Sequence, residues 1–356
     1  MAYTTINKST DYFNTKLYTG NGGTQALTGV GFQPDWTWFK SRSGTNNHVL
    51  FDIVRGVTKG IYSDLTNAED TLANSLSSFD SDGFTLGADT GSGGSVNGNT
   101  NSMASWNWKA NGASSANTAG SINSTVSANT TSGFSIVKYT GNGTGNSTIG
   151  HGLGATPKFI IVKCISATQS WGTYSPSFVS ASEPRVLYLN QTGSYANDTN
   201  VWGTSAAFNN NTFTVGDWAG SNASGQTFIA YCFADVQGFS KFGSYIGNGS
   251  NDGTFFYTGF KPAFIIQKST STVVDWQLHD NKRGQYFPGN VVNNRIEPNL
   301  NNAEGTGDDI GYDFLSNGFK TRTSHAAYNG SGLNFIYMAF AEAPLVGTNG
   351  VTAKAR

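Results

Sequence analysis

The pentapeptide YTGNG occurs at residues 18–22 and again at 139–143, and the near-identical YIGNG stands at 245–249. After each copy come glycine, proline and a short apolar run that ends in lysine, written PDWTWFK, PKFIIVK and PAFIIQK and closing at Lys40, Lys163 and Lys268. The same landmarks therefore recur in the same order at nearly constant distance. This periodicity indicates one structural unit repeated three times.

Two further landmarks follow each copy. The first is a pair of phenylalanines around four turn-forming residues, in FDSDGF (79–84), FNNNTF (208–213) and FLSNGF (314–319). The second is an aromatic closing strand, in SMASWNWKA, FIAYCFAD and FIYMAFAE, which end at Ala110, Asp235 and Glu342. A unit of roughly 110 residues has the size of a β-sandwich. We therefore predict an all-β chain of three tandem β-sandwich domains of jelly-roll or lectin-like build, at 1–130, 131–238 and 239–346, with a tail at 347–356.

The connections between the units differ. Residues 111–133 are rich in Asn, Ser, Thr and Gly, which predicts a polar linker or a long surface excursion. Only residues 236–238 separate units two and three, so we expect these two to pack as a stiff pair. The runs at 159–162 and 264–266 are continuously apolar, which indicates strands buried on both faces. The second face requires a cover, which is a long loop, the next domain or another chain.

Composition excludes several classes of protein. Charged residues make up 12% of the chain, aromatics make up 13%, and there are 45 glycines, which argues against a charged helical bundle. The formal net charge is −1, and the longest basic cluster is Lys282-Arg283, so no nucleic-acid partner is expected. No apolar run approaches the ~20 residues of a membrane span, and no secretory signal is visible at the N-terminus. Cys164 and Cys232 fit no zinc motif, and we expect buried free thiols, with a disulfide between neighbouring strands as the alternative.

The GNG element matches only part of a phosphate-binding fingerprint, because a second strand and not a helix is expected after it. Asn-Gly is a strong hairpin signal, so we interpret each pentapeptide as the turn of the first hairpin of a unit. In FDSDGF, Asp80 and Asp82 resemble the start of a calcium loop, but the downstream glutamate is missing and the other two copies lack the carboxylates. A hairpin turn is the preferred interpretation there. Asp308-Asp309 predicts an acidic surface loop, with a metal contact as the alternative.

We predict no catalytic, cofactor-binding or metal-binding residues. The five glutamates are not paired with a second acid at alternate strand positions, as a glycosidase would require. His279 and Asp280 are neighbours in sequence and point to opposite faces of a strand, so they suggest no triad. Asp52-x-x-Arg55 in unit one matches Asp280-x-x-Arg283 in unit three, and unit two has no equivalent. A charge-assisted pair that pins a loop is the preferred interpretation, and ligand binding is the alternative.

The tryptophans fall into two groups. Those within the repeated strands are expected in the core or at an interface: Trp36, Trp38, Trp106 and Trp108. The others lie in the variable middles of the units and are candidates for stacking on a sugar or for contact with a partner, although core packing is an equal alternative: Trp171, Trp202, Trp218 and Trp276.

The order YTGNG, then PKFIIVK, then FIAYCFA resembles a repeated domain of virion proteins from marine tailed bacteriophages, such as those that infect cyanobacteria. The resemblance covers all three units and is weakest in the first. It implies a structural, non-enzymatic protein of the virion, either a surface appendage such as a tail fibre or knob, or a capsid decoration, assembled in the host cytoplasm. The expected partners are other capsid or tail proteins and copies of the chain itself, with a trimer favoured. A carbohydrate-binding adhesin that recognises a host-surface glycan is the alternative, and a polysaccharide-degrading enzyme is the third hypothesis.

Overall fold

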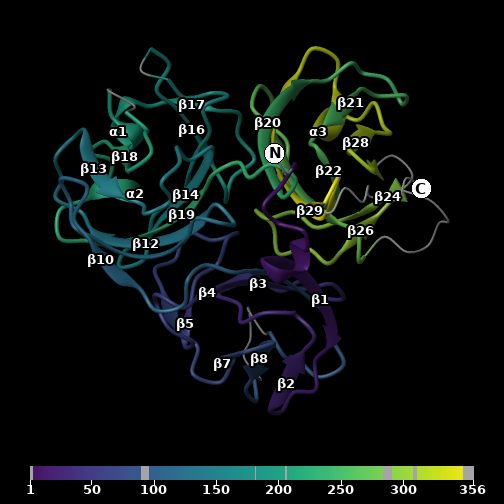
Figure 1. Cartoon of the computed structure of the whole chain (residues 1–356), viewed down its shortest axis with the longest axis horizontal. Coiled ribbons are helices and arrows are strands. Elements are labelled where there is room, and N and C mark those ends of the chain that lie inside the picture. Colours follow the sequence, from purple (N-terminus) through teal and green to yellow (C-terminus); the bar gives the residue numbers. More distant parts are fainter. Residues whose placement is uncertain are drawn as a thin grey trace.

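The chain forms three lobes around a common centre, one lobe for each sequence repeat (Figure 1). The structure is a computed structural model and describes residues 3–89, 96–180, 182–204, 207–283, 291–307 and 311–347. Strands make up nearly all the regular structure of these residues. The helices among them are single turns: η1 (Ser9–Asp11), α1 (Thr199–Trp202), α2 (Ala219–Asn222) and α3 (Ala326–Asn329). The all-β prediction is confirmed.

Each repeat has one antiparallel sheet with the same central strand order, which we call its inner sheet. The order is the strand that leads into the pentapeptide, the closing strand, the strand that ends near the repeated lysine, and a fourth strand. In repeat 1 these are β1 (Phe13–Thr19), β9 (Ser102–Trp108), β3 (Trp36–Ser41) and β4 (Val49–Asp52). In repeat 2 they are β12 (Phe134–Thr140), β19 (Thr227–Phe233), β14 (Phe159–Cys164) and β15 (Gly172–Tyr174). In repeat 3 they are β20 (Ser240–Ile246), β29 (Asn334–Pro344), β22 (Phe260–Ser269) and β23 (Gln277–Asp280).

A second, outer sheet completes each repeat. Repeat 1 has β2 (Gln25–Thr28), β8 (Gly83–Leu86) and β7 (Leu76–Asp80), and repeat 2 has β13 (Ser147–Gly150) and β18 (Thr212–Val215). Repeat 3 has β21 (Phe255–Tyr257), β28 (Gly318–Thr321), β27 (Tyr312–Leu315) and β24 (Val291–Val292). Two short ladders lie beside these sheets, β5 (Lys59–Gly60) with β6 (Asp70–Thr71) and β25 (Asn294–Arg295) with β26 (Gly305–Thr306).

The predicted hairpins around the paired phenylalanines form in repeats 1 and 3. There Phe79 lies opposite Phe84, and Phe314 lies opposite Phe319. In repeat 2 the corresponding segment is a turn in which the Asn209 amide donates to the Thr212 carbonyl at 3.0 Å, and only the second phenylalanine belongs to a strand.

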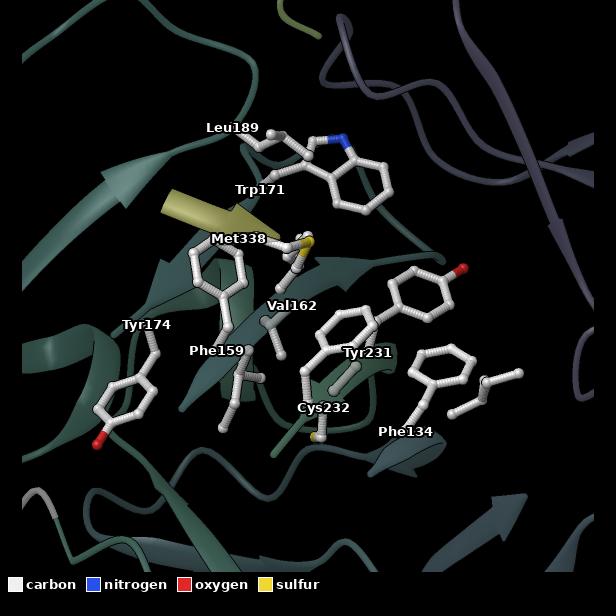
Figure 2. Packing of buried hydrophobic residues seen from close by; sticks show 14 of the residues in the cluster. Phe134, Phe159, Val162, Trp171, Tyr174, Leu189, Tyr231, Cys232 and Met338 are labelled. Atoms are coloured by element: carbon white, nitrogen blue, oxygen red, sulfur yellow. The ribbon is translucent and has the colours of Figure 1, made fainter. Parts of the chain in front are cut away.

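The inner sheets face one another at the centre of the molecule (Figure 1). Trp36 of repeat 1 stacks on Tyr231 of repeat 2, with ring centroids 4.4 Å apart. Phe340 of repeat 3 meets Trp108 of repeat 1 at 5.7 Å and Phe233 of repeat 2 at 6.0 Å. One cluster of buried residues therefore includes members of all three repeats, and Figure 2 shows part of it. The repeats therefore share this core, and repeats 1 and 3 each also have a separate hydrophobic cluster of their own.

The central strands are buried on both faces, as their apolar sequences predict. In β3, β14 and β22, every residue from Trp36 to Ser41, from Phe159 to Cys164 and from Phe264 to Ser269 is buried. Successive side chains point to opposite sides, so Trp36 enters the shared core whereas Phe39 packs inside repeat 1. The cover on the second face is therefore the other repeats of the same chain.

The polar segment between repeats 1 and 2, predicted as a linker or a long surface excursion, contains two strands, so it is not an unstructured linker. It forms β10 (Ser115–Asn117) and β11 (Ser124–Asn129), and β11 pairs with β12 along its whole length. At the other end of the same sheet lie β16 (Arg185–Tyr188) and β17 (Ala196–Asn197), which gives repeat 2 an inner sheet of eight strands. Polar residues suit these outer strands because an antiparallel sheet can leave one face in contact with water.

The pentapeptides are not hairpin turns, which corrects the prediction made for them. Each one links a strand of the inner sheet to a strand of the outer sheet. In each loop the amide of the central asparagine donates to the side-chain oxygen of a second asparagine at 3.0 Å, which pairs Asn21 with Asn97, Asn142 with Asn222, and Asn248 with Asn329. The loop tyrosine donates to the carbonyl of the residue just before that second asparagine. The motif recurs because each repeat uses it to anchor the connection between its inner and outer sheets in the same way.

Candidate functional site

The lysine that ends each repeated apolar run joins two repeats. Lys40 donates to the Asn301 carbonyl at 3.3 Å, Lys163 to the Thr66 carbonyl at 3.0 Å, and Lys268 to the Thr192 carbonyl at 3.2 Å. Repeat 1 thus binds repeat 3, repeat 2 binds repeat 1, and repeat 3 binds repeat 2. The contacts run in one direction around the molecule and close a ring.

Each of these ammonium groups is buried, and each makes three hydrogen bonds to backbone carbonyls. For Lys163 the acceptors are the carbonyls of Thr66, Cys164 and Gln169, at 3.0, 2.9 and 2.9 Å. An ammonium has three donors, so the group is fully satisfied. Burial lowers the pKa of Lys40, Lys163 and Lys268 to about 8. Their place inside the fold indicates a structural role.

A second ring of contacts comes from the residue just before the fourth inner strand. Trp171 Nε1 donates to the Tyr62 carbonyl at 2.9 Å, and Trp276 Nε1 donates to the Tyr188 carbonyl at 3.1 Å. Repeat 1 has His48 at this position, with Nε2 at 3.0 Å from the Glu297 carbonyl. Its Nδ1 accepts the indole proton of Trp38 at 2.8 Å. These contacts follow the same direction around the ring as the lysines.

The two Asp-x-x-Arg motifs are buried ion pairs that each receive a side chain from the neighbouring repeat. Asp52 pairs with Arg55 and accepts the Tyr231 hydroxyl of repeat 2 at 2.7 Å. Asp280 pairs with Arg283 and accepts the indole proton of Trp106 of repeat 1 at 2.8 Å. Both pairs are fully shielded from solvent, so the structural interpretation fits them and the ligand-binding alternative does not.

Three of the four candidate ligand-binding tryptophans are not accessible. Trp171, Trp202 and Trp276 are buried, and Trp171 and Trp276 contact the adjacent repeat of their own chain. Trp218 is half-buried and lies against Tyr188, with ring centroids 5.5 Å apart. Of the alternatives given for these four residues, core packing therefore holds for Trp171, Trp202 and Trp276, and stacking on a sugar or contact with a partner does not.

The acidic candidates are engaged in contacts within the chain. Asp80 accepts the hydroxyls of Ser78 and Thr85, and Asp82 accepts two backbone amides. Asp308 and Asp309 lie outside the described residues. Each of the five glutamates makes an ion pair, namely Glu69, Glu183, Glu297, Glu304 and Glu342. In the part of the chain that the structure describes, no three His, Cys, Asp or Glu side chains are grouped as metal ligands.

The two cysteines and His279 are also part of the core. Cys164 and Cys232 are buried free thiols, as predicted. His279 lies against Tyr312 and Tyr328 on the face of β23 opposite to Asp280. Burial lowers the pKa of His279 to about 3.

No helix among the described residues is long and apolar enough to cross a membrane.

An accessible aromatic site lies where the N-terminal segment meets repeat 3. The hydroxyls of Tyr3 and Tyr257 are 3.2 Å apart, and Tyr3 also donates to the Gly259 carbonyl at 2.7 Å. Asp235 pairs with Lys241 at 2.9 Å on the wall of the same hollow, which has a volume of about 400 Å³. An adjoining hollow of about 580 Å³ shares Tyr3, Asp235 and Gln237 with it.

The sequence interpretation missed this hollow because Tyr3 and Tyr257 belong to different parts of the chain, and neither lies in a repeated motif. It also missed the loop-anchoring asparagines, although a signal for them exists. Asn97, Asn222 and Asn329 each stand shortly before the closing strand of their repeat and could be found by aligning the three repeats.

Comparison with known proteins gives one match. A family described as Domain of unknown function (DUF7483) matches residues 8–344. A single family unit thus spans all three repeats, in agreement with their shared core. No curated protein and no solved structure matches the chain.

Proposed function

The chain thus belongs to the DUF7483 family, and we propose that it is a non-enzymatic structural protein of a bacteriophage particle. It would stand on the outside of the particle, as part of a tail fibre or knob or as a capsid decoration. The resemblance of its repeats to marine phage virion domains supports this location. The expected partners are other proteins of the capsid or tail.

The observation that carries the structural role is the ring of contacts between repeats. The polar residues that the repeats hold in common, among them Lys40, Lys163 and Lys268, join backbone segments inside the fold. The buried acids Asp52 and Asp280 likewise serve contacts between repeats. A protein whose buried polar groups join its own repeats is suited to serve as a rigid building block.

Electron microscopy of particles labelled with gold-conjugated antibody to the purified chain tests the location. Particles of the virus that encodes the chain should carry label at a fixed position on the head or tail. Antibody absorbed with the purified chain is the control and should remove the label. Purified particles that lack both the label and the chain's peptides in mass spectrometry would overturn the proposal.

The expected homotrimer stays a prediction, but the fold removes one argument for it, namely the need for a partner chain to cover the apolar strands. The apolar strands that suggested a partner chain are covered by the other repeats of the same chain. Light scattering of the purified chain distinguishes the two cases. A mass near 37.7 kDa would mean that the three-lobed chain attaches to the particle as a single unit, and three times that mass would support the trimer.

A further inference from the structure

The outer sheet of repeat 3 carries two exposed aromatic residues where the other repeats carry small ones. The three repeats can be aligned by the second phenylalanine of the paired-phenylalanine segment, which is buried in each repeat. Phe84 lies opposite Leu27 in β2, Phe213 opposite Ile149 in β13, and Phe319 opposite Phe256 in β21. On either side of these residues repeat 1 has Ala26 and Thr28, repeat 2 has Thr148 and Gly150, and repeat 3 has Phe255 and Tyr257. Two copies of the fold form without aromatic side chains here, so the fold does not require them.

Phe255 and Tyr257 point to the same side of β21, because they are two residues apart on a strand. They are 39% and 55% exposed. The residue opposite Tyr257 is Gly318, and a β-carbon built there would come within 2.8 Å of ring carbons of Phe255. The Phe255 ring therefore lies over the glycine backbone. Together the two rings form an open aromatic surface at the edge of the sheet.

Polar groups adjoin this surface at one end. Tyr257 lines the hollow of about 400 Å³ together with Tyr3, Gln237 and the Asp235–Lys241 pair. The one acid and the one base of the hollow's lining pair with each other, which favours an uncharged ligand over an anion or a cation. An exposed aromatic surface beside a few convergent hydrogen-bonding groups is the arrangement that binds a ring with one apolar face and polar edges.

We propose that this site binds an uncharged oligosaccharide. A sugar ring packs its C–H face on Tyr257, a neighbouring ring extends over Phe255, and hydroxyls reach the carboxylate of Asp235 and the amide of Gln237. A protein partner is less well matched, because a stable protein interface buries about 800 Å² on each side. Among the described residues the large apolar side chains that are exposed are few: Ile246, Phe255, Tyr257 and Val273.

The test is calorimetric titration of the full chain with a panel of neutral hexose and N-acetylhexosamine hexasaccharides of α and β linkage. At least one should bind, and its dissociation constant should rise about tenfold in Tyr257→Thr and severalfold in Phe255→Ala, which introduce the residues of repeat 1. Tyr257→Phe keeps the ring and should change the constant by less than threefold. Val273→Thr is the matched control, because Val273 is 69% exposed and lies beyond the opposite end of β22.

Binding that is equal in Tyr257→Thr and in the native chain would overturn the proposal, as would a panel in which no sugar binds. Recognition of a host protein that depends on Tyr257, with no sugar bound, would also overturn it in favour of a protein partner. The melting temperature of each variant shows that it is folded. Since the titration uses the isolated chain, its result is independent of whether the chain belongs to a phage particle.

Discussion

Repeats 1 and 3 differ from repeat 2 at the point where each receives a side chain from its neighbour. In repeat 1 the buried pair Asp52–Arg55 accepts the Tyr231 hydroxyl, and repeat 3 has the same arrangement with Trp106. In repeat 2 the aligned positions are Ser175 and Phe178, and both are buried. The aligned side chain from its neighbour is Met338, which has no proton to donate.

Figure 2 shows Met338 among apolar residues of repeat 2 such as Val162 and Trp171. The donor and the acid are therefore present together or absent together. The physical reason is that a buried aspartate needs partners for its charge, whereas a thioether packs well against apolar groups. At this position the contact between repeats is thus polar at two junctions and apolar at the third, whereas the lysine contacts are polar at all three.

The largest effect is expected from removal of a buried acid. Asp52→Ala leaves the Arg55 guanidinium and the Tyr231 hydroxyl without their shared acceptor, and breaking a buried ion pair costs about 3–5 kcal/mol. Urea denaturation measures the loss. Ser175→Ala in repeat 2 is the matched control and should cost less than about 1 kcal/mol. Equal losses in the two variants would mean that the polar and apolar junctions do not differ.

An intermediate effect is expected at the three lysines. Replacing Lys163 by methionine keeps most of the volume but removes the ammonium donor that the carbonyls of Thr66, Cys164 and Gln169 share, which should cost about 1–3 kcal/mol. Lys40→Met and Lys268→Met should cost the same within about 1 kcal/mol, because all three lysines make equivalent contacts. Thermal and urea denaturation of the three variants side by side test this. A loss confined to one variant would show that the ring is not energetically symmetric.

A smaller, pH-dependent effect is expected at the junction between repeats 1 and 3. Burial lowers the pKa of His48 well below its ordinary value, and Nδ1 is occupied by the Trp38 indole proton. Below about pH 6.5 the unfolded chain therefore binds a proton that native His48 does not. The free energy of unfolding should fall with decreasing pH by up to about 1.4 kcal/mol per pH unit from this residue.

The comparison for this prediction is His48→Gln, whose amide can accept from Trp38 and donate to the Glu297 carbonyl without titrating. The native chain should lose more stability than the variant between pH 7 and pH 5 in urea denaturation. His151 and His279 also have lowered pKa values, so the variant keeps part of the acid sensitivity. Parallel pH profiles of the two proteins would exclude His48 as a source of it. Trp171 and Trp276, its counterparts at the other junctions, do not titrate.

Local patterns in the sequence were sufficient for the all-β class, the three repeats, the two-sided burial of their central strands and the buried thiols. They were also sufficient for the structural interpretation of Asp52 and Arg55, since this pair is three residues apart in one loop. Such features depend on residue type and short spacing. Both are visible in a linear sequence.

Only the tertiary structure decided four other features. These are the cover of the central strands, the pairing of the polar segment before repeat 2, the link between sheets made by each pentapeptide, and the burial of Trp171 and Trp276. These features depend on contacts such as that of Lys40 with Asn301, which are 261 positions apart. The hollow beside Tyr257 is of the same kind, because Tyr3 reaches it from the other end of the chain. Nothing in the sequence specifies such distant pairs, because they exist only once the three repeats close into a ring.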